Sequence, residues 1–529
     1  MTIARYKSLL GLAGALAVVG STTASAAGTV SKASDSPLTF TGCTVGATTP
    51  PNPPAFNYRD SEVEPYVAAN PQNGNLIGVW QQDRWSNGGA HGLTAGSSTN
   101  GTSWSDVPLP FDSCGAPSDP TAAKFNRASD PWVSIGPDGT AYTVSISVNV
   151  NNNDNAVLAS TSSNGGSTWS SAKTVKFDAG TSPTLFEVTQ FFNDKESVTA
   201  DPTHPGTAYV VWDRLVSPSA SFESDLRARA FHGPSWFSKT TDFGQHWTTK
   251  QIFDPGSKNQ TIGNVIVVDS NTGSLYDFFN LILSTGPKSP RGFNVAFLKS
   301  TDGGGTWSGP TIVNSLQSVT VTDPKNVNPR TNSAPAPSRT SDFNPEPAID
   351  ASSGQLYVVW EDGRFSSGAH DDIVVSTSID GGKSWTTPKR VDQPNGQFAF
   401  TPNVAVASDH SVGITYYQWS PTSLGSEPTN YMIRRASPSD VSSTNADSLD
   451  AKAATTVMGS FNTLDAPFAG GYFLGDYAAV TNVGSSFVPF FVATNCTDTS
   501  CSALTSVTPP ANRTATNKNS TDVFAGTGF

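Results

Sequence analysis

Acidic residues stand at the beginning of several apolar segments of this chain, where a β-strand would present them at one end. The clearest examples are Glu64, Asp130, Glu196, Glu346 and Asp476. Carboxyl groups gathered around one centre repel each other, which raises the pKa of some of them unless cations intervene. A neutral carboxyl beside an ionised one can perform general acid and base catalysis. The same oxygens could instead bind Ca²⁺ or accept hydrogen bonds from neighbouring strands.

Arginines and histidines follow other strand-like segments at repeated positions. The arginine-containing copies are Asp83-Arg84, Asp213-Arg214 and Asp362-Gly363-Arg364. The first and third copies continue into similar loops that end at His91 and His370. These arginines could bind an acidic substrate or form ion pairs between strands, and the histidines could cap their loops. A histidine paired with a tyrosine could also remove the proton next to a uronate carboxylate, which is polysaccharide lyase chemistry.

A short turn motif recurs five times and gives the best guide to the architecture. Each copy reads Ser/Thr-x-Asp/Asn-x-Gly-x-x-Trp or a close variant, and the copies lie at 98–104, 162–169, 240–247, 300–307 and 378–385. In such a turn the Asp or Asn side chain binds nearby backbone N–H groups, and glycine supplies the positive φ of a tight reversal. The motif therefore predicts five similar turns between β-strands.

The turn motif resembles the Asp-box, or bacterial neuraminidase repeat, of sialidase-like β-propellers. This resemblance implies that the boxes lie on the face away from the active site. It also implies a substrate carboxylate held by three arginines, a tyrosine nucleophile paired with a glutamate, and an aspartate as acid and base. The residues of this chain that could take those roles are Arg84, Arg214 and Arg364, then Tyr416 or Tyr417, Glu196 or Glu346, and Asp130 or Asp60. The family's Phe/Tyr-Arg-Ile-Pro signature is absent, and Tyr58-Arg59-Asp60 matches it only in part.

A second repeat, of two apolar strands joined by a turn, predicts the number of blades. Its copies begin at Glu64, Asp130, Glu196, Gly263, Glu346, Asn403 and Asp476. We expect an all-β fold, a single propeller with seven blades, or six as the alternative, each blade a four-stranded antiparallel sheet. The predicted segments are a signal peptide at 1–26, an extension at 27–55 whose residues 36–50 supply a closing strand, the propeller at 56–505, and a C-terminal tail at 506–529.

The N-terminal segment and the cysteines predict that the chain is exported from the cell. Residues 1–26 combine Arg5 and Lys7, an apolar run and a small-residue cleavage site, which is typical of a secretory signal. Two disulfides are expected in an exported chain, Cys496 with Cys501 because they are close in sequence and Cys43 with Cys114 as the remainder. The net charge of −12 argues against nucleic acid as a partner, and no membrane partner is expected. We predict a monomer without a cofactor, with Ca²⁺ as the possible exception.

The sequence thus favours a secreted hydrolase that cleaves a terminal acidic sugar from a glycan or glycoconjugate. Two other functions stay open, a non-catalytic propeller that binds carbohydrate or protein, and a polysaccharide lyase that uses His91 or His370.

Overall fold

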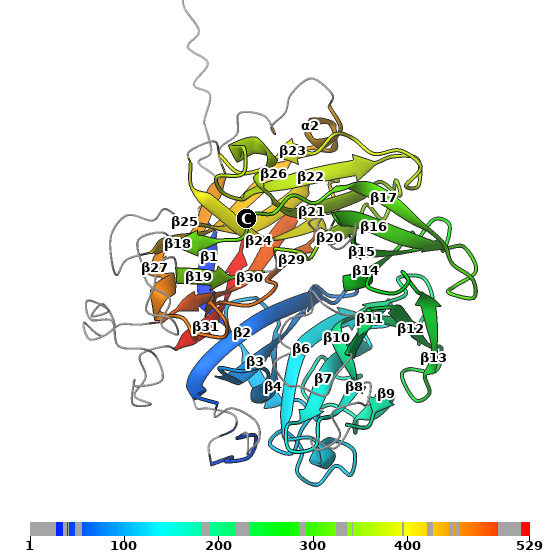
Figure 1. Ribbon diagram of the computed structural model, residues 1–529, viewed down its shortest axis with the longest axis vertical. Helices are drawn as coiled ribbons and strands as arrows, with labels where there is room; N and C mark the ends of the chain where they lie inside the picture. Colours follow the sequence, from blue (N-terminus) through cyan, green and yellow to red (C-terminus); the bar gives the residue numbers. More distant parts are fainter. Residues whose placement is uncertain are drawn as a thin grey trace, which may run out of the picture.

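The chain folds as an all-β protein whose sheets follow one another around a ring (Figure 1). The computed structural model describes residues 28–34, 40, 42–47, 55–180, 190–217, 232–284, 292–323, 336–340, 342–393, 396–419, 427–443, 449, 454–495 and 520–529. In Figure 1 the colours pass round the ring in chain order, and the red C-terminal strand lies beside the blue N-terminal strands.

Four sheets each consist of four consecutive antiparallel strands. Their strands are β10 (Gln190–Ala200), β11 (Ala208–Ser217), β12 (Ser235–Thr240) and β13 (Thr248–Phe253); β14 (Gln260–Val268), β15 (Leu275–Leu283), β16 (Gly292–Ser300) and β17 (Ser308–Ser315); β20 (Glu346–Ile349), β21 (Leu356–Asp362), β22 (Asp372–Ser378) and β23 (Lys389–Arg390); and β24 (Phe398–Val406), β25 (Val412–Trp419), β26 (Pro428–Ala436) and β27 (Thr455–Asn462). Four-stranded antiparallel sheets of this kind are consistent with propeller blades.

A larger sheet of twelve strands combines further groups of four. The groups are β29 (Ala479–Val483), β30 (Ser486–Thr494), β31 (Thr521–Thr527) and β1 (Thr29–Lys32); β2 (Asn57–Ala69), β3 (Leu76–Trp85), β4 (Ala90–Ser98) and β5 (Ser105–Pro108); and β6 (Arg127–Ile135), β7 (Ala141–Asn149), β8 (Asp154–Ser162) and β9 (Lys173–Asp178). Single residue pairs join the groups, Ser61 with Thr521 and Ala90 with Ala128. The groups are therefore nearly separate sheets.

Short elements connect these sheets. They are η1 (Ala122–Lys124), β18 (Thr322–Asp323), β19 (Ala336–Arg339), η3 (Gly363–Ser366), α2 (Pro438–Ser442), η4 (Thr463–Asp465) and β28 (Tyr472–Phe473). Strand β19 pairs with β18 and, in parallel, with β28, so a connecting segment of the chain lies beside a segment far from it in sequence.

The predicted copies of the two-strand repeat coincide with antiparallel strand pairs. These pairs are β2/β3, β6/β7, β10/β11, β14/β15, β20/β21, β24/β25 and β29/β30. The first strand of each pair contacts the first strand of the next pair, and β29 contacts β2. The inner strands thus form a closed ring, and their labels surround the middle of the molecule in Figure 1.

The hydrophobic core lies between successive sheets. Trp80, Trp212 and Trp360 are fully buried on the second strands, and Trp212 packs with Val144 and Val157 of the preceding sheet. Burial of a large apolar side chain stabilises the fold by about 1.5–3 kcal/mol, so these tryptophans help to hold neighbouring sheets together.

Each predicted Asp-box forms a turn between β-strands, as expected, and lies between the third and fourth strands of its group. In the box at 300–307 the Ser300 hydroxyl accepts a hydrogen bond from the Gly304 N–H at 2.9 Å, and Asp302 accepts one from the Thr306 N–H at 2.8 Å. Bonds from Thr306 hold the pKa of Asp302 at about 2. The ring of Trp307 lies 5.4 Å from Phe237 of the preceding sheet. The box therefore shapes its turn and also contacts its neighbour.

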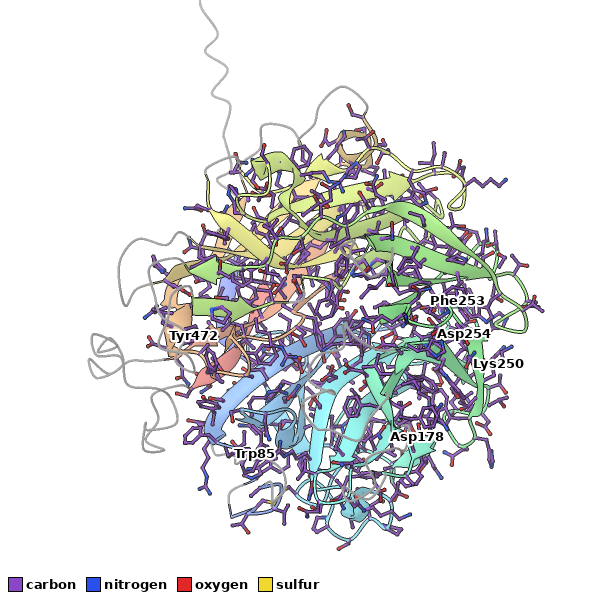
Figure 2. All side chains as sticks on the ribbon, viewed as in Figure 1. Trp85, Asp178, Lys250, Phe253, Asp254 and Tyr472 are labelled. Carbon is purple, nitrogen blue, oxygen red and sulfur yellow. A yellow bond between two sulfur atoms is a disulfide. The ribbon has the colours of Figure 1, made fainter. Side chains whose placement is uncertain are left out.

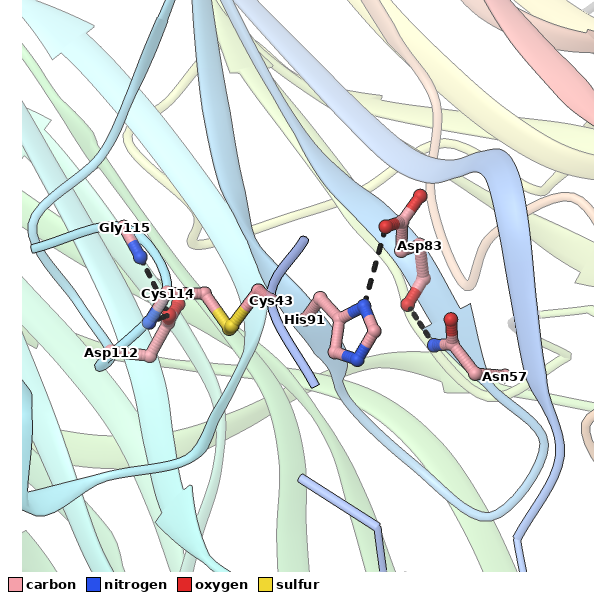
Figure 3. Close-up of a disulfide and its surroundings, with 7 residues drawn as sticks. All are labelled: Cys43, Asn57, Asp83, His91, Asp112, Cys114 and Gly115. Atoms are coloured by element: carbon pink, nitrogen blue, oxygen red, sulfur yellow. Dashed lines mark hydrogen bonds and ion pairs between the residues drawn. A yellow bond between two sulfur atoms is a disulfide. The ribbon is translucent and has the colours of Figure 1, made fainter. Parts of the chain in front are cut away.

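The disulfide between Cys43 and Cys114 is present, as predicted, and Figure 3 shows it beside Asp112 and Gly115. It ties the segment before β2 to the connection between β5 and β6, with the two Cα atoms 5.8 Å apart. Cys496 and Cys501 lie outside the described residues.

The ends of the chain close the ring at positions that differ in part from the prediction. The N-terminal strand that pairs with the last group is β1, at Thr29–Lys32, which lies within the predicted extension 27–55. Of the segment 36–50, only residues 40 and 42–47 are among the described residues, and none of these forms a strand. The predicted C-terminal tail at 506–529 contains β31, which pairs with both β30 and β1. Val523 and Ala525 of β31 are fully buried, so the end of the chain belongs to the core of its sheet.

Candidate active site

β-bulges give the inner strands a common feature that positions the candidate site. The register shifts in β2, β6, β10, β14 and β24, and the first residue of each bulge has a positive φ. These residues are Glu64, Asp130, Lys195, Gly263 and Thr401. A bulge redirects side chains and often occurs beside functional sites. Four of the five are not glycine, and such residues adopt positive φ only at a cost in energy.

The bulges change the alignment that the sequence suggested. Lys195, and not Glu196, occupies the position of Glu64 and Asp130, and Glu196 is the second residue of its bulge. Glu346 pairs with Val359, as Ser197 pairs with Val211. The predicted acidic repeat is therefore wrong in register for Glu196 and Glu346, since an inserted residue cannot be recognised from spacing alone.

Lys195 is the centre of a buried ionic cluster, which we call the Lys195 cluster and define as Glu64, Asp130, Lys195, Arg339 and Asp476. The Lys195 ammonium nitrogen lies 2.8 Å from an Asp130 oxygen, 2.6 Å from an Asp476 oxygen and 3.9 Å from a Glu64 oxygen. These residues come from β2, β6, β10, β19 and the segment before β29. The cluster therefore joins distant parts of the chain at the inner ring.

Two arginines complete the surroundings of the cluster. Arg339, on β19, donates from Nε to Asp476 at 3.0 Å, and its side chain is 33% exposed. Arg84 donates to Gln81, which in turn donates to Glu64. Both guanidinium groups lie over the ring of Phe473, at 4.4 Å for Arg339 and 4.9 Å for Arg84. Arg339 is therefore the member through which solvent reaches the cluster.

The cluster separates the pKa values of its carboxyl groups. Burial would raise the pKa of Asp130 and of Asp476, but Lys195 lowers the first, and Arg339 with Lys195 lowers the second further. Burial and the charge of Asp130 raise the pKa of Glu64 well above its usual value. Burial lowers the pKa of Lys195, but the surrounding carboxylates outweigh burial and raise it. The pKa values of Asp130 and Asp476 are therefore lowered while that of Glu64 is raised.

Glu196 lies beside the cluster with neither carboxyl oxygen hydrogen-bonded. It is 2% exposed, and burial together with the charge of Asp130 raises its pKa well above the usual value. A cavity of about 20 Å³ is lined by Glu196, Glu346 and Lys195. Burial raises the pKa of Glu346 to about 8. A space of this size can hold about one water molecule, so two carboxyl groups of raised pKa and the Lys195 side chain border a water-sized space.

Aromatic side chains lie next to the charged groups at the inner strands. Tyr66 and Trp132 are stacked with centroids 3.6 Å apart, and Tyr477 contacts both rings. The Tyr477 hydroxyl donates to the Pro131 carbonyl at 3.0 Å. These rings add to the burial that, together with the charge of Asp130, raises the pKa of Glu64 and of Glu196.

The predicted arginines do not share one set of partners. Arg84 borders the Lys195 cluster, but Arg214 donates from Nε to Asp178 at 2.8 Å and stacks on Phe191. Asp178 ends β9 (labelled in Figure 2), so this ion pair joins two sheets. Arg364 donates from Nε to Asp362 at 2.8 Å. The interpretation as an ion pair between strands thus describes Arg214, whereas the partner of Arg364 is two residues before it in the same segment. Only Arg84 lies near the candidate site.

The predicted histidines and Tyr416 lie outside the Lys195 cluster. His91 is 3% exposed, and its Nδ1 is 3.2 Å from Asp83 (Figure 3). His370 lies near Asp372, and burial together with Arg390 lowers its pKa. Tyr416 is fully buried in a core cluster between β20–β23 and β24–β27. Burial raises its pKa.

Sequence reasoning missed Lys195, Arg339 and Gln81. Lys195 directly precedes the predicted Glu196, and the missing signal was the bulge rather than the residue type. Arg339 lies in a connection outside both repeats, so no pattern indicated it. Gln81 follows the buried Trp80 directly, and Asp213 and Glu361 follow Trp212 and Trp360 in the same way. The last two accept hydrogen bonds from the N–H groups of Gly263 and Thr401 in the next sheet.

The described part of the chain shows neither a cluster of metal ligands nor a membrane-spanning helix. Within it, no group of three or more His, Cys, Asp or Glu side chains is placed to hold a metal ion. Among the same residues, no helix is long and apolar enough to cross a membrane.

No protein-family model and no curated protein matches the chain. Among solved structures, an α-L-arabinofuranosidase of Fusarium graminearum is 13% identical with a TM-score of 0.43, covering 72% of this chain and 94% of the other. An α-L-arabinanase of Penicillium chrysogenum, complexed with arabinobiose, is 12% identical with a TM-score of 0.42 and covers 70% and 95%. A sialidase of Streptococcus pneumoniae is 11% identical with a TM-score of 0.40 and covers 68% and 65%. The structural neighbours of this chain thus include arabinofuranosidases and sialidases.

Proposed function

We propose that this protein is a secreted glycan-active hydrolase whose active site is the Lys195 cluster together with Glu196. The proposal rests on the opposite pKa shifts of two neighbouring carboxyl groups, Asp130 and Glu196. The pKa of Asp130 is lowered by Lys195, and the pKa of Glu196 is raised by burial and by the charge of Asp130. Carboxyl groups whose surroundings drive their pKa values apart are the pattern of general acid and base catalysis.

Each carboxyl group has a separate role in this proposal. Glu196 is neutral, so it can donate its proton to the oxygen of the leaving group. Asp130 is ionised and held by Lys195 at 2.8 Å, so it can stabilise positive charge that develops on the sugar or activate water. The buried, unpartnered state of Glu196 supports its assignment as the acid, because an unsatisfied buried polar group needs a reason to persist.

The two arginines support an acidic sugar as substrate. Arg339 and Arg84 both lie over Phe473, and Arg339 is the more exposed of the two. Arginine binds carboxylates in a bidentate geometry that lysine cannot provide. A carboxylate-bearing sugar that approaches Arg339 would bring its glycosidic bond towards the cluster. This pair replaces the three-arginine arrangement that the Asp-box resemblance implied.

We further propose that the ring is a single seven-bladed propeller and that the protein is an exported monomer. The closed sequence of contacts from β2 through β6, β10, β14, β20, β24 and β29 back to β2 supports seven blades. The signal-like segment at 1–26 supports export.

A non-catalytic binding propeller is the second candidate, and the internal pairing of the cluster favours it. Lys195, Asp130 and Asp476 satisfy one another, and Arg339 pairs with Asp476. Such a network can hold the inner strands together without any reaction. Burial of His91 on Asp83 gives no support to a lyase that uses this histidine.

The variant Glu196→Gln separates catalysis from a structural role. Because Glu196 is already neutral, glutamine keeps the shape and charge of the folded state, so the unfolding midpoint should stay unchanged. Release of chromogenic sugars from a panel of acidic and neutral glycosides should fall by about 10²–10⁴-fold.

The matched control is Asp213→Asn, another buried carboxyl of raised pKa, which bonds Gly263 of the next sheet. This control should keep its rate. Equal rates for Glu196→Gln and wild type would overturn the assignment. Glycan binding without release by the wild type would favour the binding propeller, and a rise in ultraviolet absorbance on uronate polysaccharides would favour elimination.

A further inference from the structure

A second cavity lies at the rim of the molecule, beside the disulfide. Its volume is about 450 Å³, which falls within the range of small-ligand sites. Three segments form it, namely residues 44–47 after Cys43, residues 123–126 before β6, and the turn after β7. Arg127 directly follows the second segment and lies three residues before Asp130 on the same strand. The cavity is therefore close to the Lys195 cluster along β6.

The polar lining of this cavity is made of amides, hydroxyls and one ammonium group. Asn126, Asn149 and Asn151 supply the amides, and Lys124 supplies the ammonium group. None of the described residues that line the cavity is acidic, although the whole chain has a net charge of −12. Amide groups offer both donors and acceptors, as sugar hydroxyls do, and a lysine attracts a carboxylate.

Two asparagines of the lining are held by hydrogen bonds within the protein. Asn126 accepts a hydrogen bond from the Val150 N–H at 3.0 Å, and Asn149 donates to the Lys124 carbonyl at 3.0 Å. Each amide nitrogen carries two N–H donors, and the Asn149 bond to Lys124 uses one of them. A preformed site of this kind loses little conformational entropy on binding.

The outer wall is held by the disulfide and by a buried arginine. Arg127 donates from Nε to the Gly46 carbonyl at 2.7 Å, and its guanidinium lies over Trp85 at 4.5 Å. The Cys43–Cys114 bond anchors the same segment from its other end. The wall thus has no sheet of its own and depends on these two attachments.

We propose that this cavity is an auxiliary glycan-binding site, which takes a carboxylate-bearing sugar unit with its carboxylate towards Lys124 and its hydroxyls towards Asn126 and Asn149. The inference rests on the proposed function and adds a second contact for the same class of glycan. Asp130 follows Asn126 by four positions along the chain, roughly 13 Å of extended strand. One acidic oligosaccharide could therefore reach from the Lys195 cluster into the cavity.

Binding of oligogalacturonate, with its carboxyl-reduced neutral counterpart as the second probe, tests this site separately from hydrolysis. Titration calorimetry on full-length Glu196→Gln protein gives the affinity whether or not the enzyme turns over. We expect the acidic probe to bind at least tenfold more tightly than the neutral one, and Lys124→Met to remove that difference. Val45→Asp places a carboxylate on the exposed rim of the cavity and should weaken the acidic probe at least tenfold.

Lys383→Met is the matched control, because Lys383 is an exposed lysine of an Asp-box turn far from the cavity in sequence. It should bind like its parent. Equal affinity in Lys124→Met, Val45→Asp and the parent would overturn the auxiliary site while leaving the proposed hydrolysis untouched. Absence of binding of both probes to the parent would also overturn it. Loss of hydrolysis in Glu196→Gln is measured independently, so the two proposals can fail separately.

Discussion

Lys195 determines how several acidic side chains coexist at the inner ring. Three carboxyl groups lie within 3.9 Å of its ammonium nitrogen. Removing one partner from a buried ionic network leaves uncompensated charge, which typically costs about 3–5 kcal/mol. Burial would raise the pKa of Asp130 and Asp476, but Lys195, joined at Asp476 by Arg339, lowers both. Burial and the charge of Asp130 raise the pKa of Glu64 and of Glu196, and the proposed chemistry uses this difference.

The buried carboxyl group of Glu346 should make the free energy of unfolding depend on pH. Its folded-state pKa is about 8, whereas its ordinary value is 4.5. Between these values the unfolded chain has released the proton and the folded chain still holds it. Stability therefore falls as the pH rises, by up to about 1.4 kcal/mol per pH unit for this group. Glu346→Gln should make the plot of unfolding free energy against pH less steep in this window, as measured by urea denaturation.

The control for this measurement is Asp254→Asn. Asp254 is labelled in Figure 2. Burial would raise the pKa of Asp254, but hydrogen bonds from His232 and Gly256 outweigh it and lower the value. Asp254 is therefore ionised in both states across the window, and its variant should keep the wild-type slope. If Glu346→Gln also kept that slope, Glu346 would not be neutral in the folded protein.

At the scale of elements, the Asp-boxes join neighbouring sheets. Trp307 contacts Phe237, Trp385 contacts Phe297, and in each pair the phenylalanine belongs to the preceding sheet. Lys239 of the preceding sheet donates to the Gly303 carbonyl within the box. The turn chemistry could be predicted from sequence because it is local. The contacts across sheets could not, because they depend on the curvature of the ring.

Gly304→Ala tests this role of the box. Gly304 has a φ of +88°, and a Cβ there would lie 2.3 Å from the ring of Phe237. Left-handed backbone costs roughly 1–2 kcal/mol for an alanine, and overpacking adds about 1–3 kcal/mol. We therefore expect a loss of about 2–5 kcal/mol in the free energy of unfolding, measured by chemical denaturation.

Gly303→Ala is the control within the same turn. Its φ is +68°, but the nearest atom to an added Cβ is the Lys239 ammonium nitrogen at 3.0 Å, the end of a flexible side chain. It should lose only the backbone term, roughly 1–2 kcal/mol. Equal losses in the two variants would show that Phe237 accommodates the methyl group and that the box does not fix the spacing of the sheets.

The site was predictable at the level of residue types but not of register. Asp130 and Asp476 were identified as acids at strand starts, and both belong to the Lys195 cluster. Glu196 was aligned with them, yet the bulge places Lys195 there instead. Strand pattern has a period of two, so one inserted residue reverses which side chain faces the centre. Arg339 could not be found at all, because only the ring brings β19 beside β28 and Asp476.

At the scale of the whole molecule, the closure of the ring was predicted in principle but not in detail. Pairing of the first and last segments follows from the need to avoid open sheet edges. The segment that pairs, Thr29–Lys32, is short and mostly polar, so it carries no strand pattern. Residues 521–527 combine buried Val523 and Ala525 with small polar residues, and they were therefore mistaken for part of a tail.

The two strands of this closure should contribute unequally to the stability of the whole ring. β31 is largely buried and pairs with β30 and β1, while β1 covers only its outer edge. Removal of residues 28–34 abolishes four register pairs, the Lys32–Asp522 ion pair and the burial of Ala33. At about 1 kcal/mol per hydrogen bond, less the entropy regained, this predicts a loss of roughly 1–3 kcal/mol.

The shortened protein should therefore keep a single cooperative unfolding transition in calorimetry, at a lower midpoint. Removal of residues 520–529 takes away the buried β31 and leaves β30 paired only with β29, so this variant should fail to fold. Lys32→Met isolates the half-exposed ion pair, worth at most about 1 kcal/mol, and should account for less than half of the effect of the longer deletion. If loss of β1 alone prevented folding, the outer strand rather than β31 would be what closes the ring.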